Sequence, residues 1–399
     1  MNIPNDVGVV SFGLKTGIIT FDDNIIDVVD KSIEKNINDH PDTIQDKDII
    51  CITEAVVAIT QHNYVKLEDI SNQIREKLNL KENSTLGIMY PILSRNRFSL
   101  ILKAIAKVVP KGKVIIQLLF PDDEQGNPIL SKDYRKKFGK LFEDKITLED
   151  IGNNRFIHPE TGVDYIKYYK ELIESQGSNC EIYLANSTKY MVENNPDGVL
   201  VSNVHHRIDT LENLKNRDYN NVITLQDIFS DSTKEVYCKY GLLGSNILDP
   251  DNNLLKLGPK DCDNVCEKVK ERIKEKYNKD VEVIIYGDGA YKDPESGIYE
   301  LADPVSAFGT TKAISSNNRI GVKTKFLMQK LYNQGKNKEE ILNFIKQEKQ
   351  RIVDEKKKDD YCSEGTTPRK IKNLVSSLAD LVSGSADSNT PVVIVRGFL

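Results

Sequence analysis

Apolar positions recur with two different spacings along this chain, and each spacing predicts a different kind of element. Short apolar runs rich in β-branched residues, such as VEVIIYG at 281–287 and PVVIVRG at 391–397, are typical of strands buried on at least one face. Residues 22–38 and 67–78 instead carry apolar side chains at helical spacing. The pattern therefore predicts a protein of the α/β class.

The N-terminal part is predicted to begin with short strands. Residues 7–20 favour strand, turn and strand, and residues 48–61 favour a strand followed by a turn or a second strand. Gly8, Gly13 and Gly17 do not form a dinucleotide-binding fingerprint, because the GxGxxG order and the helix directly after it are missing.

From about residue 84 strands alternate with helices, which predicts a mainly parallel sheet covered on both faces. We interpret residues 81–234 as an inserted α/β unit, and residues 1–80 and 235–399 as a mixed α/β core built from both chain ends. Ligands bind such parallel sheets beyond the carboxyl ends of the strands. The polar candidates there are Asn186, Ser187, Thr188, His205, His206 and Arg207.

Two pairs of residues in this unit have more than one interpretation. His205 and His206 could bind a metal or shuttle protons, but neighbours in an extended chain point to opposite sides, so we expect a hydrogen-bonded or exposed pair. Arg95 and Arg97 could hold a phosphate or a carboxylate, although we expect them at the charged start of a surface helix.

Residues 322–365 are predicted to form a helical arm within the core. Gly335 separates two Lys/Glu-rich helices, and their interleaved charges favour i,i+4 pairs rather than a nucleic-acid patch. Residues 363–370 are a linker or an ordered active-site loop. A further helix over 373–384 is predicted to end at Gly384 as its C-cap.

Composition narrows the class of protein. The chain has 399 residues, enough for two or three core-bearing units, with 39% apolar and 29% charged residues, as in globular proteins. A net charge of −5 argues against a dedicated nucleic-acid binder, and no apolar run approaches the roughly 20 residues that span a bilayer. Residues 1–13 lack the basic and apolar regions of a signal peptide. We therefore expect neither nucleic acid nor a membrane as a partner.

The six cysteines are scattered, which favours reduced thiols and a cytoplasmic location. Cys262 and Cys266 are four positions apart on a predicted helix, and we expect them to pack, because no Cys/His set completes a zinc site.

Acidic residues gather in the loop that follows the strand predicted at 281–287. Carboxylate oxygens bind Mg²⁺ or Mn²⁺ and leave positions for phosphate oxygens. An Asp/Gly/Pro loop can also be acidic only because it is solvated, and the spacing leaves both interpretations open. The candidate metal ligands are Asp288, Asp293, Glu295, Glu300 and Asp303.

Three separated regions carry motifs: DKDIICITEAVVA at 46–58; GLLGSNI, LGPKDCDNVCEKVKERI and VIIYGD within 241–288; and LADLVSGSADSNTPVVIVRG at 378–397. In this order they resemble the GTP-dependent gamma-glutamyl ligase family that acts on the coenzyme F-420 precursor. GLLGSNI is similar to the family's Gly-Ile-Asp-x-Ser-Asn-Val, and VIIYGD is similar to the strand that ends in a metal-binding Asp.

The resemblance implies amide-bond formation through an acyl phosphate, with GTP (or ATP) as co-substrate, two divalent ions and a homodimer. By the same resemblance Asp288 aligns with the metal-binding Asp, and Ser245 and Asn246 align with the Ser-Asn pair at the nucleotide or metal site. Thr53 and Arg396 match motif positions, and we include them among the candidate cofactor-binding residues.

The chain departs from the family pattern at several positions. The acidic residue before Ser-Asn falls at Leu243, the lysine of a Ser-Lys-x-Glu-Gly pattern falls at Ile59, and Gly289 stands where the family has Thr. VSNV at 201–204 is a second possible match for Ser-Asn. We reject it, because the following helix and the Asp-bearing strand are missing.

The leading hypothesis is a metal-dependent, nucleotide-using amide ligase with an unknown carboxylate acceptor. The alternatives are a catalytically inactive ligase-fold protein that binds or regulates, and a metal-dependent phosphohydrolase.

Overall fold

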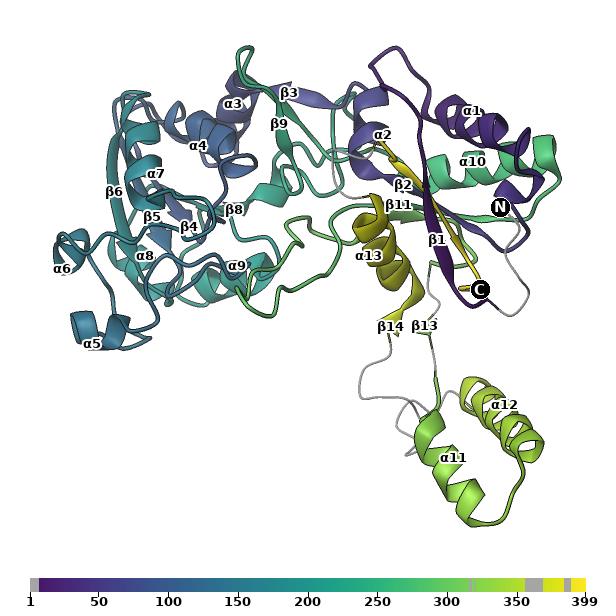
Figure 1. Cartoon of the computed structure of the whole chain (residues 1–399). Coiled ribbons are helices and arrows are strands. Elements are labelled where there is room, and N and C mark those ends of the chain that lie inside the picture. Colours follow the sequence, from purple (N-terminus) through teal and green to yellow (C-terminus); the bar gives the residue numbers. More distant parts are fainter. Residues whose placement is uncertain (1–6, 316–317, 320, 356–368, 384–388) are drawn as a thin grey trace.

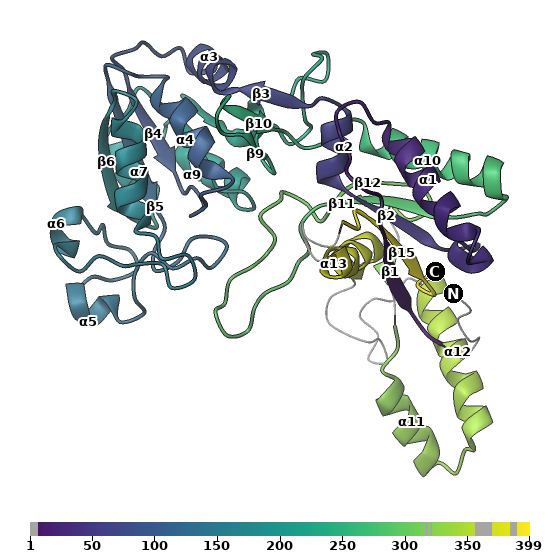
Figure 2. The ribbon, with the colours of Figure 1, turned by 45° about the horizontal axis from the view of Figure 1, so that its top comes forward.

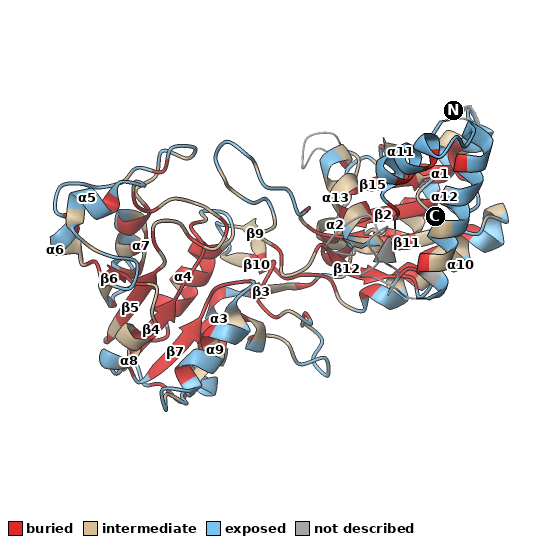
Figure 3. Cartoon of the chain, turned by 90° about the horizontal axis from the view of Figure 1, so that it is seen from below, coloured by how far each residue is buried: buried red, intermediate tan, exposed pale blue. Residues whose placement is uncertain are grey.

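The computed structural model describes residues 7–315, 318–319, 321–355, 369–383 and 389–399. Two five-stranded sheets lie in different parts of the molecule, and a pair of helices extends away from both (Figure 1). Buried residues concentrate in the strands of the two sheets and on the helix faces packed against them (Figure 3).

The first sheet joins the two ends of the chain. Its strand order is β1-β15-β2-β11-β12. β2 and β11 are parallel, whereas every other neighbouring pair is antiparallel. The strands are β1 (Val10–Leu14), β15 (Val392–Arg396), β2 (Ile49–Thr53), β11 (Glu282–Tyr286) and β12 (Ala307–Thr310). The predicted mixed core built from both chain ends is confirmed.

Helices cover both faces of this sheet. α1 (Ile25–Ile37) and α10 (Cys262–Tyr277) pack on one face with Ile50, and α13 (Ile371–Ser383) packs on the other with Cys51. Because successive strand residues point to opposite faces, a strand covered on both sides reads as an unbroken apolar run. This explains the runs at 49–52, 283–286 and 392–395.

The second sheet is parallel throughout, with the order β6-β5-β4-β7-β8. The strands are β4 (Thr85–Met89), β5 (Lys113–Leu118), β6 (Asn179–Leu184), β7 (Gly198–Val201) and β8 (Val222–Thr224). The chain starts at the central strand β4, moves outward to β6 and returns to β7. The strand order therefore reverses between β4 and β7, which is where sheets of this kind bind ligands.

Helices also cover both faces of the second sheet. α3 (Leu67–Lys77), α4 (Phe98–Ala106) and α7 (Tyr165–Glu174) pack on one face, and α8 (Lys189–Glu193) and α9 (Arg207–Lys215) contribute to the core on the other. The predicted parallel α/β unit is confirmed.

Shorter elements complete the chain. β3 (Tyr64–Lys66), β10 (Leu254–Lys256) and β9 (Asn246–Asp249) form a three-stranded sheet. The remaining elements are α2 (Glu54–Thr60), α5 (Tyr134–Phe138), α6 (Leu148–Ile151), β13 (Asn318–Arg319), β14 (Arg369–Lys370) and the 3₁₀ turns Pro41–Thr43 and Leu225–Asp227.

The helical pair seen in Figure 1 consists of α11 (Thr324–Asn333) and α12 (Lys338–Asp354). Gly335 lies between them with a φ of +80°, a conformation that glycine adopts without the steric cost of a side chain. The predicted separation of two helices at this glycine is confirmed. The predicted C-cap Gly384 and residues 363–368 lie outside the described residues.

Two predictions near the N-terminus were wrong. Residues 15–20 form no second strand: Gly17 has a φ of +82°, and Ile18 is 91% exposed in the loop that follows β1. After β2 there is neither a turn nor a second strand, because α2 begins directly at Glu54. Burial of Val57 and Ala58 accounts for the apolar run that suggested extended chain.

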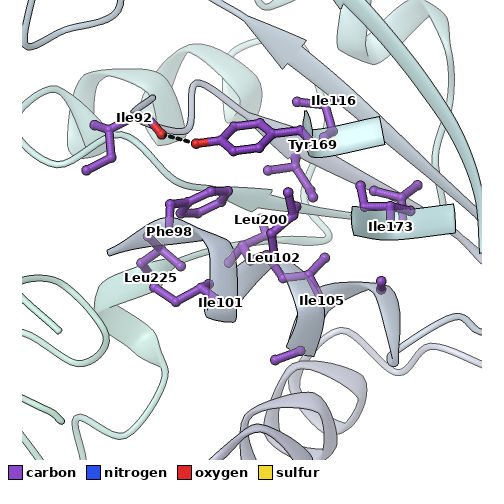
Figure 4. Close-up of a cluster of buried hydrophobic side chains, with 14 of the residues drawn as sticks. Ile92, Phe98, Ile101, Leu102, Ile105, Ile116, Tyr169, Ile173, Leu200 and Leu225 are labelled. Atoms are coloured by element: carbon purple, nitrogen blue, oxygen red, sulfur yellow. Dashed lines mark hydrogen bonds between the residues drawn. The ribbon is translucent and has the colours of Figure 1, made fainter. Parts of the chain in front are cut away.

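The segment after β4 is held in place by α7. Tyr169 Oη donates a hydrogen bond to the carbonyl oxygen of Ile92 at 2.6 Å and accepts one from the backbone N–H of Ser94 at 3.0 Å. Its ring packs beside Phe98 in the buried cluster of Figure 4. The backbone that leads from β4 into α4 is therefore fixed by a side chain from a different helix.

We expect Tyr169→Phe to lower the free energy of unfolding by about 1–3 kcal/mol, because both hydrogen bonds of the Tyr169 hydroxyl are lost and only the bond between the N–H of Ser94 and the carbonyl oxygen of Ile92 remains. Urea denaturation followed by circular dichroism measures this. Tyr168→Phe on the same helix is the control and should change stability by less than about 0.5 kcal/mol. Equal effects of the two substitutions would show that the hydrogen bonds of Tyr169 do not stabilise this segment.

Candidate functional site

A cavity of about 440 Å³ opens where β2 and β11 end. These strands are parallel neighbours, with Thr53 paired to Tyr286, so their carboxyl ends meet at one edge of the sheet. The lining comes from distant parts of the chain: residues 17–19, 53–56, 286–288 and 389–391, together with Arg97, Asn246, Asp303, Asp380 and Ser383.

Four of the candidate residues from the sequence line this cavity: Thr53, Asn246, Asp288 and Asp303. Ser245 lies next to it but is buried, and its hydroxyl donates to the carbonyl oxygen of Leu242 at 2.6 Å. Asp380, Ser383 and residues 389–391 also line it, so the structure brings residues from all three motif regions to one place.

The remaining acidic candidates lie away from the cavity lining. Asp293 accepts hydrogen bonds from the backbone N–H groups of Glu295 and Ser296, as a turn-forming Asp does. Glu295 and Glu300 are exposed. For these three residues the structure agrees with the interpretation of a solvated Asp/Gly/Pro loop.

Arg396 lies at the opposite end of the sheet. Its guanidinium binds both carboxylate oxygens of Asp48, at 2.8 and 2.7 Å, and the Asp48 side chain is only 1% exposed. Asp48 directly precedes β2, whereas the cavity lies beyond the last residue of β2. The contacts of Arg396 are therefore those of a buried structural ion pair.

Asp303 is the most buried acid of the cavity. Its carboxylate accepts hydrogen bonds from the backbone N–H of Asp288 and from Arg97 Nη1, both at 2.8 Å. Two glycines allow this approach: a Cβ on Gly287 would lie 2.3 Å from Asp303 Oδ2, and one on Gly244 would lie 3.0 Å from Oδ1. The glycines in YGDG and GLLG therefore make room for a carboxylate.

Arg97 reaches the same carboxylates from the second sheet. It follows β4, and its Nη2 lies 3.0 and 2.9 Å from the two carboxylate oxygens of Asp288. The expected surface position was wrong for Arg97, whose side chain is 20% exposed, whereas Arg95 is exposed. One guanidinium thus bridges two acids of the core.

Three further charged residues of the site were missed from the sequence. Glu54 is buried and binds Lys256 Nζ at 2.9 and 2.8 Å, and Asp380 Oδ2 accepts a hydrogen bond from the N–H of Gly289. Glu54 and Asp380 both lie inside motif regions, and this position could have identified them as candidate site residues. No feature of the sequence around Lys256 predicts that it belongs to the site.

Burial and mutual repulsion shape the charge of the cavity. Burial, together with the Asp303 carboxylate, raises the pKa of Asp288 to about 7 against the opposing effect of Arg97. Burial also raises the pKa of Glu54 and of Asp380. With every carboxyl ionised, four carboxylates face the two cations Arg97 and Lys256, which leaves an excess of two negative charges. Such an excess favours the binding of a divalent cation.

The part of the chain that the structure describes holds no group of three or more His, Cys, Asp or Glu side chains arranged to hold a metal ion. The donor chemistry still fits, because Asp288 and Asp303 offer the oxygen ligands that Mg²⁺ and Mn²⁺ prefer. The guanidinium of Arg97 now binds those oxygens. A metal ion therefore fits these residues only in exchange for Arg97.

The other candidate groups have structural explanations. His205 and His206 are both exposed, and His205 Nε2 lies 3.1 Å from the carbonyl oxygen of Leu301, so the expected hydrogen-bonded or exposed pair is confirmed. Cys262 and Cys266 belong to α10 and are buried against the first sheet, as expected for packing. Among the described helices, none is both long enough and apolar enough to cross a membrane.

Two crystal structures of E. coli tRNA N6-threonylcarbamoyladenosine dehydratase, one in complex with AMP, are similar to this chain at 10% and 11% sequence identity. The matches cover 61% and 60% of this chain and 81% and 78% of the other, each with a TM-score of 0.23. At that score the likeness supports no conclusion about fold or ligand. No curated protein matches the chain.

The model of one protein family matches residues 13–397, which include the second sheet, the first sheet from Gly13 of β1 onward and every residue of the cavity. This chain belongs to the F420-0:gamma-glutamyl ligase family.

Proposed function

We propose that this protein is a ligase that uses GTP, or ATP in its place, and a divalent cation to join an amino acid to a carboxylate acceptor. The family is a gamma-glutamyl ligase family, which supports bond formation of this type. The observation that carries the proposal is the meeting of Thr53, Asn246, Asp288 and Asp303 around one cavity.

The proposed reaction has two steps. A carboxylate oxygen of the acceptor attacks the terminal phosphorus of the nucleotide, and the nucleoside diphosphate leaves. The amine of the amino acid then attacks the acyl carbon, loses a proton, and inorganic phosphate leaves. In both steps negative charge builds on phosphate oxygens, so positive groups beside them lower the barrier.

The chain's own residues have distinct parts in this proposal. Asp288 and Asp303 would hold Mg²⁺ or Mn²⁺, which neutralises phosphate charge when it is bound. The hydroxyl of Thr53 and the side-chain amide of Asn246 offer hydrogen bonds to the nucleotide. The Glu54–Lys256 pair, buried at the start of α2, holds this wall of the cavity in place.

One observation favours a second candidate, a ligase-fold protein that binds its ligands without catalysis. Leu243 stands where the family has an acidic residue, and it is 1% exposed within the hydrophobic core beside α4. It cannot bind a cation. A phosphohydrolase that uses the same acidic residues is the third candidate.

Phosphate release separates these functions. We expect release when the protein is incubated with Mn²⁺, GTP or ATP, pooled amino acids and a mixture of carboxylic acids, and none when the amino acids or the carboxylic acids are left out. Release from the nucleotide alone indicates a phosphohydrolase. Absence of nucleotide binding in calorimetry would overturn both enzymatic functions.

A homodimer and a cytoplasmic location complete the proposal. The homodimer is proposed only from the resemblance to the family, and light scattering during size-exclusion chromatography tests it.

A further inference from the structure

The loop between β11 and β12 of the core lies between the two sheets (Figure 2). It contacts the segments that follow β4, β5 and β7, at the carboxyl ends of strands of the second sheet. Gln125, which follows β5, makes two hydrogen bonds to this loop: its side-chain Nε2 donates to the carbonyl oxygen of Leu301 at 2.9 Å, and its backbone carbonyl oxygen accepts from the N–H of Tyr299 at 2.8 Å. Arg97, which follows β4, binds Asp288 and Asp303. The edge where a doubly wound sheet binds ligands is thus occupied by acids of the same chain.

We propose that Arg97 binds the terminal phosphate of the nucleotide, and that Asp288 and Asp303 occupy its guanidinium in the ligand-free protein in place of that phosphate. This inference rests on the function proposed above and assigns the anion-binding residue of the same cavity. Arg97 then supplies the one cationic side chain among the described residues that line the cavity.

The geometry of the contact supports this assignment. A guanidinium presents a planar set of donors that matches the paired oxygens of carboxylates and phosphates. In the structure it contacts three carboxylate oxygens of two acids, which resembles the contacts that it would make to a phosphate group.

The backbone before Arg97 is fixed by hydrogen bonds, whereas the Arg97 side chain lies beside a cavity into which it can move. Tyr169 holds Ile92 and Ser94, and Asp123 Oδ2 accepts the N–H of Leu93 at 2.8 Å. The Arg97 side chain lines the cavity of about 440 Å³. The guanidinium therefore changes partners through side-chain rotation, without refolding of the segment that carries it.

Charge balance links this exchange to cation binding. Asp288 and Asp303 attract either Arg97 or a divalent ion, and the two cations repel each other when both are close to these acids. Asp288 and Asp303 would hold a divalent ion in place of the guanidinium, and Arg97 would then face the phosphate. Arg97 competes with the metal ion and assists the nucleotide, so its removal has opposite effects on the two affinities.

Calorimetry on Arg97→Gln tests this, with Arg95→Gln as the control that removes the same charge from the exposed neighbour. We expect Arg97→Gln to bind Mn²⁺ alone about tenfold more tightly, and GTP with Mn²⁺ about 100-fold more weakly, as for loss of a charge-assisted contact. Affinity for GDP should stay within about twofold, since GDP lacks the terminal phosphate. Arg95→Gln should match the wild type in all three titrations.

Other results overturn the inference. If Mn²⁺ and GTP both bind more weakly to Arg97→Gln, Arg97 only maintains the structure. If GTP and GDP lose equal affinity, it does not contact the terminal phosphate. Should Arg97→Gln fail to fold, Arg97→Lys keeps the charge but not the paired donors, and GTP binding should then fall about tenfold at unchanged thermal stability. Wild-type protein that binds neither GTP nor ATP would instead refute the proposed function, and the titration with Mn²⁺ alone would still test the competition.

Discussion

Asp288→Asn is expected to weaken Mn²⁺-dependent GTP binding by about 100-fold or more, because an amide cannot supply the negative charge that a divalent cation needs. Asp288 lies directly beyond β11 at the edge of the cavity, next to the buried Asp303. Isothermal titration calorimetry with GTP in the presence of Mn²⁺ measures the change. Binding of GTP without metal should not be weakened, because the substitution removes a carboxylate that competes with the phosphate for Arg97.

Glu300→Gln is the matched control for this substitution. Glu300 belongs to the same loop and was an equally acidic candidate from the sequence, but it is exposed and lies outside the lining of the cavity. We expect GTP affinity within about twofold of the wild type, because an exposed charge at a distance is screened by solvent and salt. If Asp288→Asn binds GTP normally, or if Glu300→Gln has the same effect, the cation site is not at the end of β11.

The pattern of hydrophobic residues in the sequence predicts the strands and helices whose side chains are buried in the two cores. The strand at 282–286 is recognisable from the sequence because both of its faces are covered, and its position predicts Asp288 at a strand end. The same apolar pattern wrongly predicted a strand around Ile18, which lies in an exposed loop that lines the cavity. Hydrophobicity alone does not separate a buried strand from a loop beside a ligand site.

Contacts between distant segments were not predictable in this way. Arg97 and Asp288 are 191 positions apart, and they meet because the loop after β11 lies across the edge of the second sheet. The residue spacing within SRNRF (residues 94–98) does not predict this contact between distant segments.

Resemblance to a family also leaves contacts unpredicted, because it shows that a residue stands in a motif but not which residue it binds. Arg396 stands in the tail motif, yet its partner is Asp48 at the far end of the sheet.

Arg396→Leu is therefore expected to lower the free energy of unfolding by about 3–5 kcal/mol, the usual cost of leaving one partner of a buried ion pair unpaired. Asp48 lies at the start of β2 with its side chain 1% exposed, and Arg396 supplies two of the hydrogen bonds to its carboxylate. Urea denaturation measures the loss. Arg155→Leu, which removes a surface contact 4.0 Å from Asp164, should cost less than about 1 kcal/mol.

Two further measurements decide whether Arg396 is structural or binds the nucleotide. Adding Asp48→Asn to Arg396→Leu removes the unpaired charge, so the double variant should recover part of the lost stability, as coupled partners do. GTP affinity of the folded Arg396→Leu protein should equal that of the wild type, since the cavity lies at the other end of β2. Weaker GTP binding at unchanged stability would place Arg396 in the nucleotide site and would mean that its bond to Asp48 contributes little to the fold.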